Sequence, residues 1–291
     1  MTEGRAIDGL LLVDKPPGIT SHDAVAAARR VLATRRIGHA GTLDPFATGL
    51  LVLLIGHATR LLPYLDGEPK VYEAAITFGA ETDTDDATGV VVRNADLPPA
   101  ARVRDALPAL TGSIDQVPPA YSAKQVGGRR AYDAARRGVP LALEPTRVTV
   151  HEWRVDDLRA DRLQATITCA GGTYIRALAR DLGRLCGSAA YLASLRRTRS
   201  GAFHVNGATS LDALKSGAVD VLPPLAAVAH LPTTRLADDE VTHVRHGRAI
   251  PASEDAGAAA TSAMVDARGR LVAVAERDGA GWQPRVVLPN E

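Results

Sequence analysis

The sequence predicts an α+β protein in which a large sheet-containing domain precedes a small β-rich module. The chain has 291 residues, more than one ordinary domain requires. Strand-like and helix-like segments of mixed length follow one another without the regular βαβ spacing of a doubly wound sheet. Pro223-Pro224 and the alanine-rich stretch after them mark a boundary near Leu231. We therefore expect domains over 1–230 and 231–291.

Residues 1–65 are predicted to alternate between strand and helix. The apolar run at 10–13 is typical of a short buried strand, which the prolines of the turn at 14–18 end. Thr20 or Ser21 then caps a helix that extends to about residue 32, with an aspartate in its first turn.

A glycine-containing loop separates this helix from the next strand. Residues 38–48 show no periodicity, so we predict a loop there. The apolar run 49–56, bounded by glycines, predicts a central strand, and 57–65 predicts a short helix. Alternation over 70–78 predicts a further strand, and the acidic stretch 81–89 predicts a turn-rich loop.

The rest of the chain contains further elements of both kinds. The predicted helices lie at 101–110, 130–137 and 173–185, the last capped by Thr173, and an irregular segment lies at 113–128. The predicted strands lie at 148–155, 163–168, 191–198, 201–205, 264–266, 271–276 and 285–288.

Composition excludes several protein classes. Apolar residues make up 46% and charged residues 23% of the chain, as in soluble globular proteins. The two cysteines, Cys169 and Cys186, form no C-x-x-C pair, so we expect neither a disulfide framework nor a zinc site. The N-terminal apolar run is too short for a signal peptide, and no segment approaches the roughly 18 apolar residues of a membrane span. We expect a cytoplasmic protein.

Charge is distributed unevenly along the chain. The net charge is +1, but residues from 231 onward carry seven Lys/Arg against nine Asp/Glu, so residues 1–230 carry +3. Within these 230 residues the basic side chains cluster at 29–36, 124–137 and 176–199. Such clusters either line a track for phosphates or cover solvated helix faces, and charge alone does not distinguish these interpretations.

The segment 36–49, RIGHAGTLDPFATG, is the most informative stretch of the sequence. Its glycines allow the backbone to turn tightly, and Pro45 holds Asp44 in an extended conformation. A predicted buried strand follows directly, so the carboxylate is mounted on rigid structure. The residue types alone leave two interpretations open: a turn residue that bonds its own backbone, or a reactive carboxylate.

Four motifs, in order along the chain, resemble those of the TruB-type tRNA pseudouridine synthases. They are DKPPGITS at 14–21, GHAGTLDPFATGLL at 38–51, KVY at 70–72 and GGTYIRALARDLG at 171–183. The segment YSAK at 121–124 with GRRAY at 128–132 is also similar to a family motif. The resemblance is collinear from about residue 9 to 200. It implies a mixed, mainly antiparallel sheet and isomerisation of uridine 55 in the T loop of tRNA.

The resemblance also implies the catalytic residues. Asp44 matches the nucleophile, Tyr72 matches the active-site tyrosine, and Arg176 matches the arginine that pairs with the nucleophile. The reaction breaks one bond and forms another without oxidation, so neither a cofactor nor a metal is expected. From the residues alone, alternation favours Tyr72 as a core aromatic of a strand, and Arg176 is only a cation disfavoured near a helix start.

Substrate contacts are implied for further residues. Tyr174 and Leu195 match residues of the uracil pocket, although both are also suited to core packing. His39 resembles the histidine that supports base extrusion, with a general base as the alternative. In the basic segment at about 121–140, Lys124, Arg129 and Arg130 are expected to contact the T arm. The C-terminal module faintly resembles a PUA-like RNA-binding domain.

Three functions are compatible with these motifs. The first is the stand-alone T-loop uridine isomerase, which we expect to act on the tRNA T stem-loop as a monomer without a protein partner. The second is an RNA-binding folding factor for which catalysis is secondary. The third is the same chemistry on another RNA, as in guide-dependent relatives that rely on partner proteins.

Overall fold

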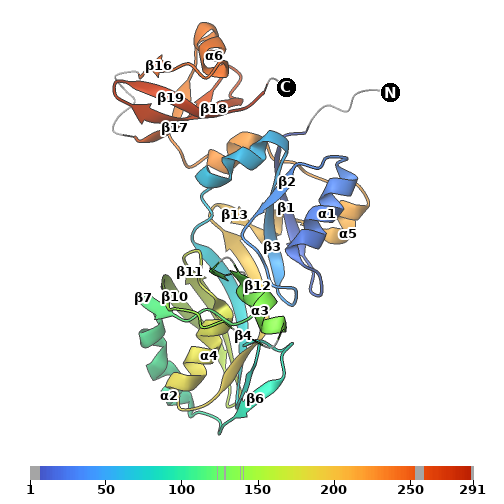
Figure 1. The fold of residues 1–291 in the computed structure, drawn as a ribbon, viewed down its shortest axis with the longest axis vertical. Coiled ribbons are helices and arrows are strands. Elements are labelled where there is room, and N and C mark those ends of the chain that lie inside the picture. Colours follow the sequence, from blue (N-terminus) through green and yellow to red (C-terminus); the bar gives the residue numbers. More distant parts are fainter. Residues whose placement is uncertain are drawn as a thin grey trace. The chain divides into compact units, whose positions relative to one another are not determined.

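The computed structural model describes residues 7–122, 124–127, 129–137, 139, 141–252 and 259–289 (Figure 1). The chain forms two compact units, each assembled from segments that are separate in sequence. Unit 1 lies within 1–45, 50–66 and 205–291, and unit 2 within 46–49 and 67–204.

Unit 1 begins with strand β1 and helix α1, as the sequence predicts. Thr20 caps α1 through a reciprocal capping box, in which the Asp23 backbone N–H donates to Thr20 Oγ1 over 3.1 Å and the Thr20 N–H donates to Asp23 Oδ2 over 2.8 Å. Small and aliphatic residues of α1 pack onto β1 and β3 in a buried core that includes Val13, Ala24 and Leu53. Outside the C-terminal module, the elements of this unit are β1 (Gly9–Lys15), α1 (Ser21–Val31), β2 (Ile37–Ala40), β3 (Thr48–Ile55), η1 (Gly56–Tyr64), η3 (Val205–Gly207), β14 (Thr209–Ser210), α5 (Leu211–Lys215) and η4 (Pro224–Val228).

Strand β2 occupies the first part of the stretch predicted to be a loop. It pairs antiparallel with β3, so that Ile37 lies opposite Ile55 and His39 opposite Leu53. Gly38 interrupts the alternation of apolar and polar side chains that would indicate a strand. The strand forms because its backbone hydrogen-bonds to β3. The loop itself begins at Gly41, whose φ of 85° lies in the left-handed region that glycine tolerates.

In its described residues, the C-terminal part of unit 1 is a five-stranded sheet with one helix (Figure 1). Its strands follow the order β15-β17-β18-β19-β16, and α6 packs against β18. Trp282 is 1% exposed and forms the core with Val244 and Met264. The three strands predicted for this module are present with shifted bounds, whereas its helix was not predicted. The elements are β15 (Thr233–Arg235), α6 (Asp238–Arg245), β16 (Ile250–Pro251), β17 (Thr261–Val265), β18 (Leu271–Asp278) and β19 (Gly281–Val287).

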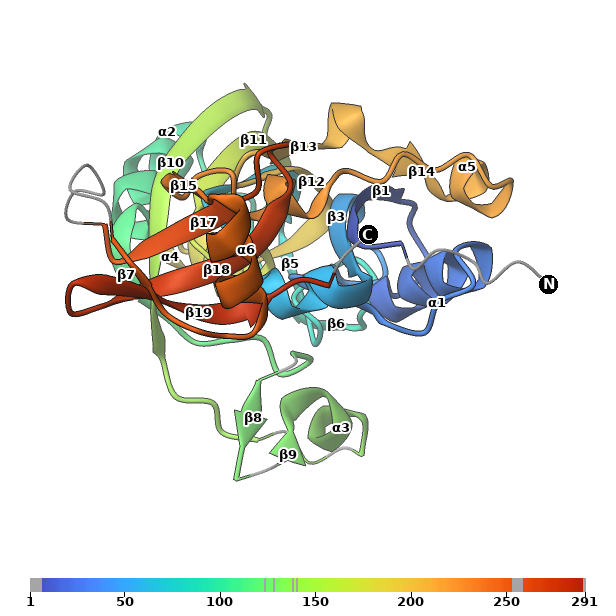
Figure 2. The same cartoon turned by 90° about the horizontal axis from the view of Figure 1, so that it is seen from above.

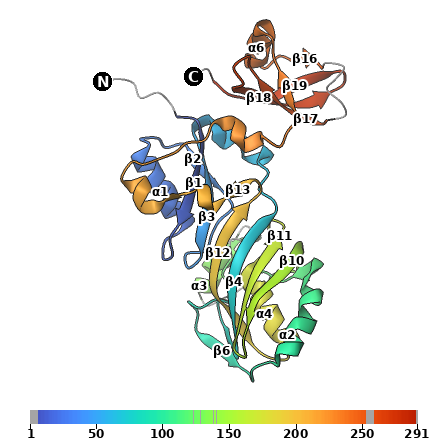
Figure 3. The same cartoon turned by 180° about the vertical axis from the view of Figure 1, so that it is seen from behind.

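Unit 2 is built on an antiparallel sheet in the order β12-β4-β11-β10-β7, and Figure 3 shows the first four of these strands side by side. The first residues of β3 join it in parallel, with Thr48 opposite Arg196. The strands are β4 (Lys70–Phe78), β7 (Gly112–Gln116), β10 (Thr146–Leu158), β11 (Arg162–Cys169), β12 (Ala190–Ser200) and β13 (Phe203–His204). The predicted fold class, α+β with a mixed and mainly antiparallel sheet, is confirmed.

Helix α4 (Ile175–Leu185) packs directly on β12. A Cβ at Gly183 would lie 2.5 Å from the Ala190 backbone nitrogen, so only glycine permits this close approach. The helix starts at Ile175 with Tyr174 as its N-cap, one residue later than the Thr173 cap that we predicted. The remaining elements of unit 2 are β5 (Ala80–Thr82), β6 (Val91–Asn94), α2 (Ala100–Ala106), η2 (Leu107–Leu110), β8 (Gln125–Val126), β9 (Arg129–Arg130) and α3 (Ala131–Arg136).

Candidate active site

The loop that carries Asp44 is fastened on both sides of that residue. On one side, Ser21 Oγ accepts from the Leu43 N–H over 2.9 Å and donates to the Leu43 carbonyl over 3.1 Å. On the other, the Gly18 N–H donates to the Pro45 carbonyl over 2.8 Å. Leu43 is 3% exposed, whereas Asp44 is only partly buried. The chain therefore presents the carboxylate from a fixed backbone.

Lys15, at the end of β1, adds hydrogen bonds from a charged group to those that hold this loop. Its side chain is fully buried, and Nζ donates to the carbonyls of Pro16 and Ile19 over 2.9 Å each and of Pro45 over 3.2 Å. All three ammonium donors are thus used. Burial lowers the pKa of Lys15 to about 8, although the nearby Asp44 carboxylate acts to raise it. A cation therefore lies close enough to Asp44 to interact with it electrostatically.

His39 lies on β2 in unit 1, five residues before Asp44. Its ring stands edge-on to that of His22, with the centroids 5.5 Å apart. The Gly41 turn separates β2 from the loop that carries Asp44, so His39 and Asp44 are mounted on adjoining pieces of rigid structure.

Tyr72 and Leu195 share one face of the sheet of unit 2. Tyr72 on β4 lies directly opposite Arg197 on β12, and Ala74 lies opposite Leu195. Directly paired residues of an antiparallel sheet point to the same side, and Tyr72 and Ala74 are two residues apart. Tyr72 and Leu195 are each 7% exposed, and Arg197 is 1% exposed. This face therefore combines an aromatic ring, an apolar side chain and a buried cation.

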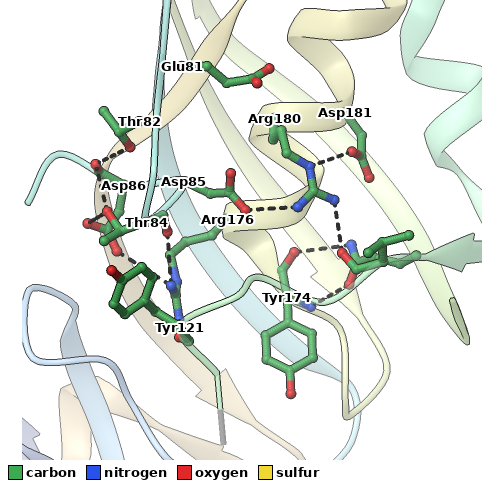
Figure 4. A network of polar contacts seen from close by, with 12 residues as sticks. Glu81, Thr82, Thr84, Asp85, Asp86, Tyr121, Tyr174, Arg176, Arg180 and Asp181 are labelled. Atoms are coloured by element: carbon green, nitrogen blue, oxygen red, sulfur yellow. Dashed lines mark hydrogen bonds and ion pairs between the residues drawn. The ribbon is translucent and has the colours of Figure 1, made fainter. Parts of the chain in front are cut away.

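Arg176 lies in the first turn of α4 and is 4% exposed. Nη1 donates to the Thr84 carbonyl over 3.0 Å and lies 3.7 Å from Asp86 Oδ2, and Nη2 donates to the Tyr121 carbonyl over 2.9 Å (Figure 4). A planar guanidinium held by such contacts has a defined direction. Two segments, at 84–86 and at 121, therefore orient Arg176.

Asp86 is held as firmly as the arginine beside it. Its Oδ1 accepts from Thr84 Oγ1 over 2.8 Å, from the Thr88 N–H over 2.9 Å and from Thr88 Oγ1 over 2.6 Å. The carboxylate is 4% exposed. The acidic stretch 81–89, which the sequence indicated only as a turn-rich loop, is thus the ordered partner of Arg176.

Tyr174 caps α4 without using its side chain. Gln116 at the end of β7 binds its backbone on both sides, because Nε2 donates to the Tyr174 carbonyl over 3.1 Å and Oε1 accepts from the Tyr174 N–H over 2.8 Å. Figure 4 shows the Tyr174 ring directed away from the contacts of Arg176. The phenol ring is therefore available for other contacts while its backbone is fixed.

The basic segment forms a small hairpin followed by a short helix, and Figure 2 shows β8, β9 and α3 apart from the sheet of unit 2. Lys124 Nζ donates to Thr146 Oγ1 over 3.2 Å, which ties the hairpin to β10. Arg129 is exposed, whereas the side chain of Arg130 lies outside the described part of the chain. Of the two predicted phosphate contacts whose side chains are described, Lys124 and Arg129, Arg129 is the more accessible.

The predicted site residues divide between the two units. Asp44 and His39 belong to unit 1, and the other described candidates belong to unit 2: Tyr72, Lys124, Arg129, Tyr174, Arg176 and Leu195. Sequence reasoning missed the residues that position them. Gln116 carries no local signal, whereas Lys15 lies within the DKPPGITS motif and the acidic residues at 81–86 stand out by their unusual density.

The described residues offer neither a clustered metal-ligand set nor a membrane-spanning helix. They contain no group of three or more His, Cys, Asp or Glu side chains arranged to hold a metal ion. Within the same residues, no helix has the length and apolar character that crossing a membrane requires.

Models of known protein families match nearly the whole chain. The model of the TruB family pseudouridylate synthase N-terminal domain matches residues 29–175. The tRNA pseudouridylate synthase B C-terminal domain matches 176–220, and the tRNA pseudouridine synthase II C-terminal model matches 231–289. These three matches follow one another in the order of the chain.

Individual relatives agree with these models. tRNA pseudouridine synthase B of Thermobifida fusca (strain YX) is 47% identical over 292 residues, covering 97% of this chain and 98% of the relative. The protein of the same name from Gloeobacter violaceus is 43% identical over 300 residues, covering 98% of this chain and all of the relative.

Solved structures show the same fold at lower sequence identity. One is an H/ACA RNP bound to a substrate RNA containing 2'-deoxyuridine, with a TM-score of 0.70 and 23% identity over 97% of this chain and 85% of the other. A Cbf5-Nop10-Gar1 complex gives a TM-score of 0.70 and 24% identity over 96% and 84%. With the family models and the relatives, the chain belongs to the TruB family of pseudouridylate synthases and is an isomerase that converts uridine to pseudouridine.

Proposed function

We propose that this enzyme isomerises uridine 55 in the T loop of tRNA, with Asp44 as the nucleophile and without a cofactor. The structure around Asp44 is the main support for the proposal. Hydrogen bonds fix the backbone at the neighbouring Leu43 and Pro45, and the Asp44 carboxylate is only partly buried. The name tRNA pseudouridine synthase B, borne by relatives that match almost the full length, supports tRNA as the substrate.

The reaction exchanges one bond of the nucleoside for another. The N1–C1′ bond breaks, the uracil rotates, and C5 bonds to C1′; C5 then loses its proton, and N1 ends with a proton. No electrons leave the nucleoside. Asp44 forms a covalent adduct during the exchange, which divides one difficult step into easier ones, as carboxylates do in glycoside hydrolysis.

Tyr72 and Arg176 assist this carboxylate in the proposed mechanism. The Tyr72 ring stacks on the extruded uracil, and its hydroxyl assists removal of the C5 proton. Arg176 keeps the nucleophile ionised, because a nearby cation favours the charged form of a desolvated carboxyl. The oriented guanidinium of Arg176 supports this role, since its position does not depend on the substrate.

The uridine must leave the folded T loop before C1′ can be attacked, at a cost of a few kcal/mol. We propose that Tyr174 and Leu195 line the pocket for the extruded base. His39 fills the space that the base vacates. Phosphate contacts from the basic segment offset the cost of extrusion, with Lys124, Arg129 and Arg130 as the contacting residues.

The proposed arrangement assigns the main catalytic work to residues 1–230, with 231–291 as a PUA-like domain. The basic segment of this chain supports action as a single subunit, without partner proteins such as those of the Cbf5-Nop10-Gar1 complex. Because tRNA is the proposed substrate, we place the reaction in the cytoplasm.

A tRNA transcript labelled with tritium at C5 of uracil tests the proposed substrate. The protein is expected to release about one label per tRNA to water, because one C5 proton leaves in each isomerisation. A matched transcript with cytidine at position 55 should release none. Equal release from both transcripts would contradict the assignment to position 55, whatever residue acts as nucleophile.

The same assay separates the enzyme from the RNA-folding alternative. Tight binding of the transcript with no release of tritium would favour a binding factor. The complete set of Asp44, Tyr72 and Arg176 in this chain favours the enzyme.

A further inference from the structure

Helix α4 carries a second buried arginine one turn after Arg176. Arg180 is 7% exposed, and residues four apart on a helix lie on the same face. Both guanidinium groups reach the same two segments, one at 84–86 and the other at 117–121 (Figure 4). The two arginines therefore form parallel cross-links between the same three pieces of chain.

Arg180 uses all three of its guanidinium nitrogens. Nη1 donates to Asp85 Oδ2, Nε to Asp181 Oδ1 and Nη2 to the Val117 carbonyl, each over 2.9 Å. A planar fork with every nitrogen engaged cannot rotate without losing a hydrogen bond. Arg180 thus fixes Asp85 relative to both α4 and the segment at 117.

Asp85 occupies a backbone conformation that few side chains adopt. Its φ is 60°, in the left-handed region that costs a residue other than glycine free energy. The Asp85 N–H donates to the Thr82 carbonyl, and the Leu192 N–H of β12 donates to the Asp85 carbonyl over 3.0 Å. Burial raises the pKa of Asp85 to about 6 despite the neighbouring arginines, so the carboxylate is ionised at neutral pH.

The residues on either side of Asp85 are the partners of Arg176. Thr84 offers its carbonyl, and Asp86 offers its carboxylate, to the Arg176 guanidinium. Any change of the backbone at Asp85 moves both partners, because each is directly bonded to it. A buried ion pair is seldom the most stable choice for a core position, which favours a role in fixing geometry.

We propose that Asp85 and Arg180 are a positioning pair for the reaction: they hold Thr84 and Asp86 in the arrangement that orients Arg176. The inference rests on the proposed role of Arg176 beside the nucleophile. Asp85 and Arg180 do not contact the substrate in this scheme. Their loss therefore lowers the rate of isomerisation and leaves the affinity for tRNA unchanged.

Charge-removing variants test the pair in single-turnover assays with saturating enzyme, using tritium release from the tRNA transcript. Asp85→Asn keeps a residue type that tolerates positive φ and removes only the charge. Arg180→Met removes the guanidinium group with its charge and its hydrogen-bond donors. Arg180→Lys keeps the positive charge but lacks the planar array of donors. Each is expected to lower the rate constant roughly tenfold to a hundredfold, as a small misplacement of a catalytic group does. The dissociation constant for tRNA should change less than about threefold, since phosphate contacts dominate it.

Arg184→Gln is the matched control. Arg184 is one turn further along α4 and binds Glu81 of the same acidic stretch through Nε and Nη2, over 2.9 and 2.8 Å. This variant is expected to lower the melting temperature as the others do while keeping the rate within about twofold of wild type, because it leaves 84–86 in place. The double variant Asp85→Asn/Arg180→Met should be no slower than the slower single variant, since both act through one contact.

Arg176→Lys distinguishes failure of this inference from failure of the proposed function. If Arg176→Lys is slow but folded Asp85→Asn and Arg180→Lys proteins keep the wild-type rate, the pair is merely structural and the inference is wrong. A wild-type rate for Arg176→Lys would remove the role of Arg176 and, with it, the basis of the positioning pair. Slow variants at 85 and 180 with a fast Arg184→Gln protein support the inference.

Discussion

At the scale of single residues, the position of Asp44 depends on Lys15. A lysine that is fully buried is unusual, and here each of its three donors meets a backbone carbonyl. One of these carbonyls belongs to Pro45, next to Asp44. The ammonium group therefore both closes the turn after β1 and fixes the loop that carries the proposed nucleophile.

Lys15→Met is expected to destabilise the protein by roughly 3 kcal/mol, because it leaves the carbonyls of Pro16 and Ile19 without a donor and removes one of the two donors to the Pro45 carbonyl. Isomerisation should slow as well, since the Pro45 backbone keeps only its hydrogen bond from the Gly18 N–H. Urea denaturation measures the loss of stability. Lys215→Met, on an exposed residue of α5, is the control and should have little effect. A Lys15→Met protein with wild-type stability would show that these hydrogen bonds contribute nothing.

Glu81 predicts a pH dependence of stability. Burial raises its pKa, but hydrogen bonds from Arg184 and Arg93 lower it more, from the ordinary 4.5 to about 2. A carboxyl group with a lowered pKa stabilises the folded protein above its ordinary pKa and loses this contribution as the pH falls. Glu81→Gln should therefore lower the free energy of unfolding by roughly 1–2 kcal/mol at neutral pH, allowing for screening at the exposed arginines.

The difference between wild type and Glu81→Gln should shrink as the pH falls from 4.5 towards about 2. Denaturant titrations at several pH values measure it. A difference that stays constant across this range would mean that the charge of Glu81 does not stabilise the fold.

At the scale of elements, the junction of β3 with β12 depends on Gly49. Its φ is 99°, and a Cβ there would lie 2.2 Å from the Arg197 carbonyl oxygen. Gly49→Ala combines backbone strain with a clash against backbone, so we expect a loss of roughly 3–5 kcal/mol. Gly217→Ala is a matched control with φ of 87° and no atom within 4 Å of the added Cβ, and should cost about 1 kcal/mol. Equal losses in thermal unfolding would show that the contact with β12 is not tight.

Elements with strong local patterns could be predicted from the sequence. The strand β4, the buried strand β3 and the capped helix α1 all lie where the periodicity and the cap indicated. Strand β2 was missed because it depends on its partner β3 rather than on its own residues. The start of α4 was misplaced because Gln116, 58 residues away, binds the backbone of Tyr174.

The candidate site could be predicted only in part, for a similar reason. The motifs identified Asp44, Tyr72 and Arg176 by resemblance. The Asp85–Arg180 contact joins residues that are 95 positions apart. Asp85 lies in the acidic stretch and Arg180 in the GGTYIRALARDLG motif, but neither pattern indicates that the two side chains meet. Ion pairs between distant segments arise from packing, so a single sequence does not reveal them.

At the scale of the whole molecule, a net charge of +1 gives little sign of an RNA substrate, whereas exposed basic residues such as Arg129 do. Arg129→Ala should weaken binding of tRNA and reduce the slope of log affinity against log salt by about one. Filter binding across a range of KCl concentrations measures this. Arg159→Ala is the control, because Arg159 already pairs with Asp157 over 2.8 Å. An unchanged slope for Arg129→Ala would exclude a phosphate contact at this residue.

The central claim is that Asp44 is the nucleophile, and the single-turnover rate of Asp44→Asn tests it most directly. The amide cannot form the adduct, so tritium release from the tRNA transcript should fall by roughly 10⁴-fold or more. The dissociation constant for tRNA should remain close to that of wild type, because phosphate contacts dominate the affinity. Release at the wild-type rate by the Asp44→Asn protein would contradict the account.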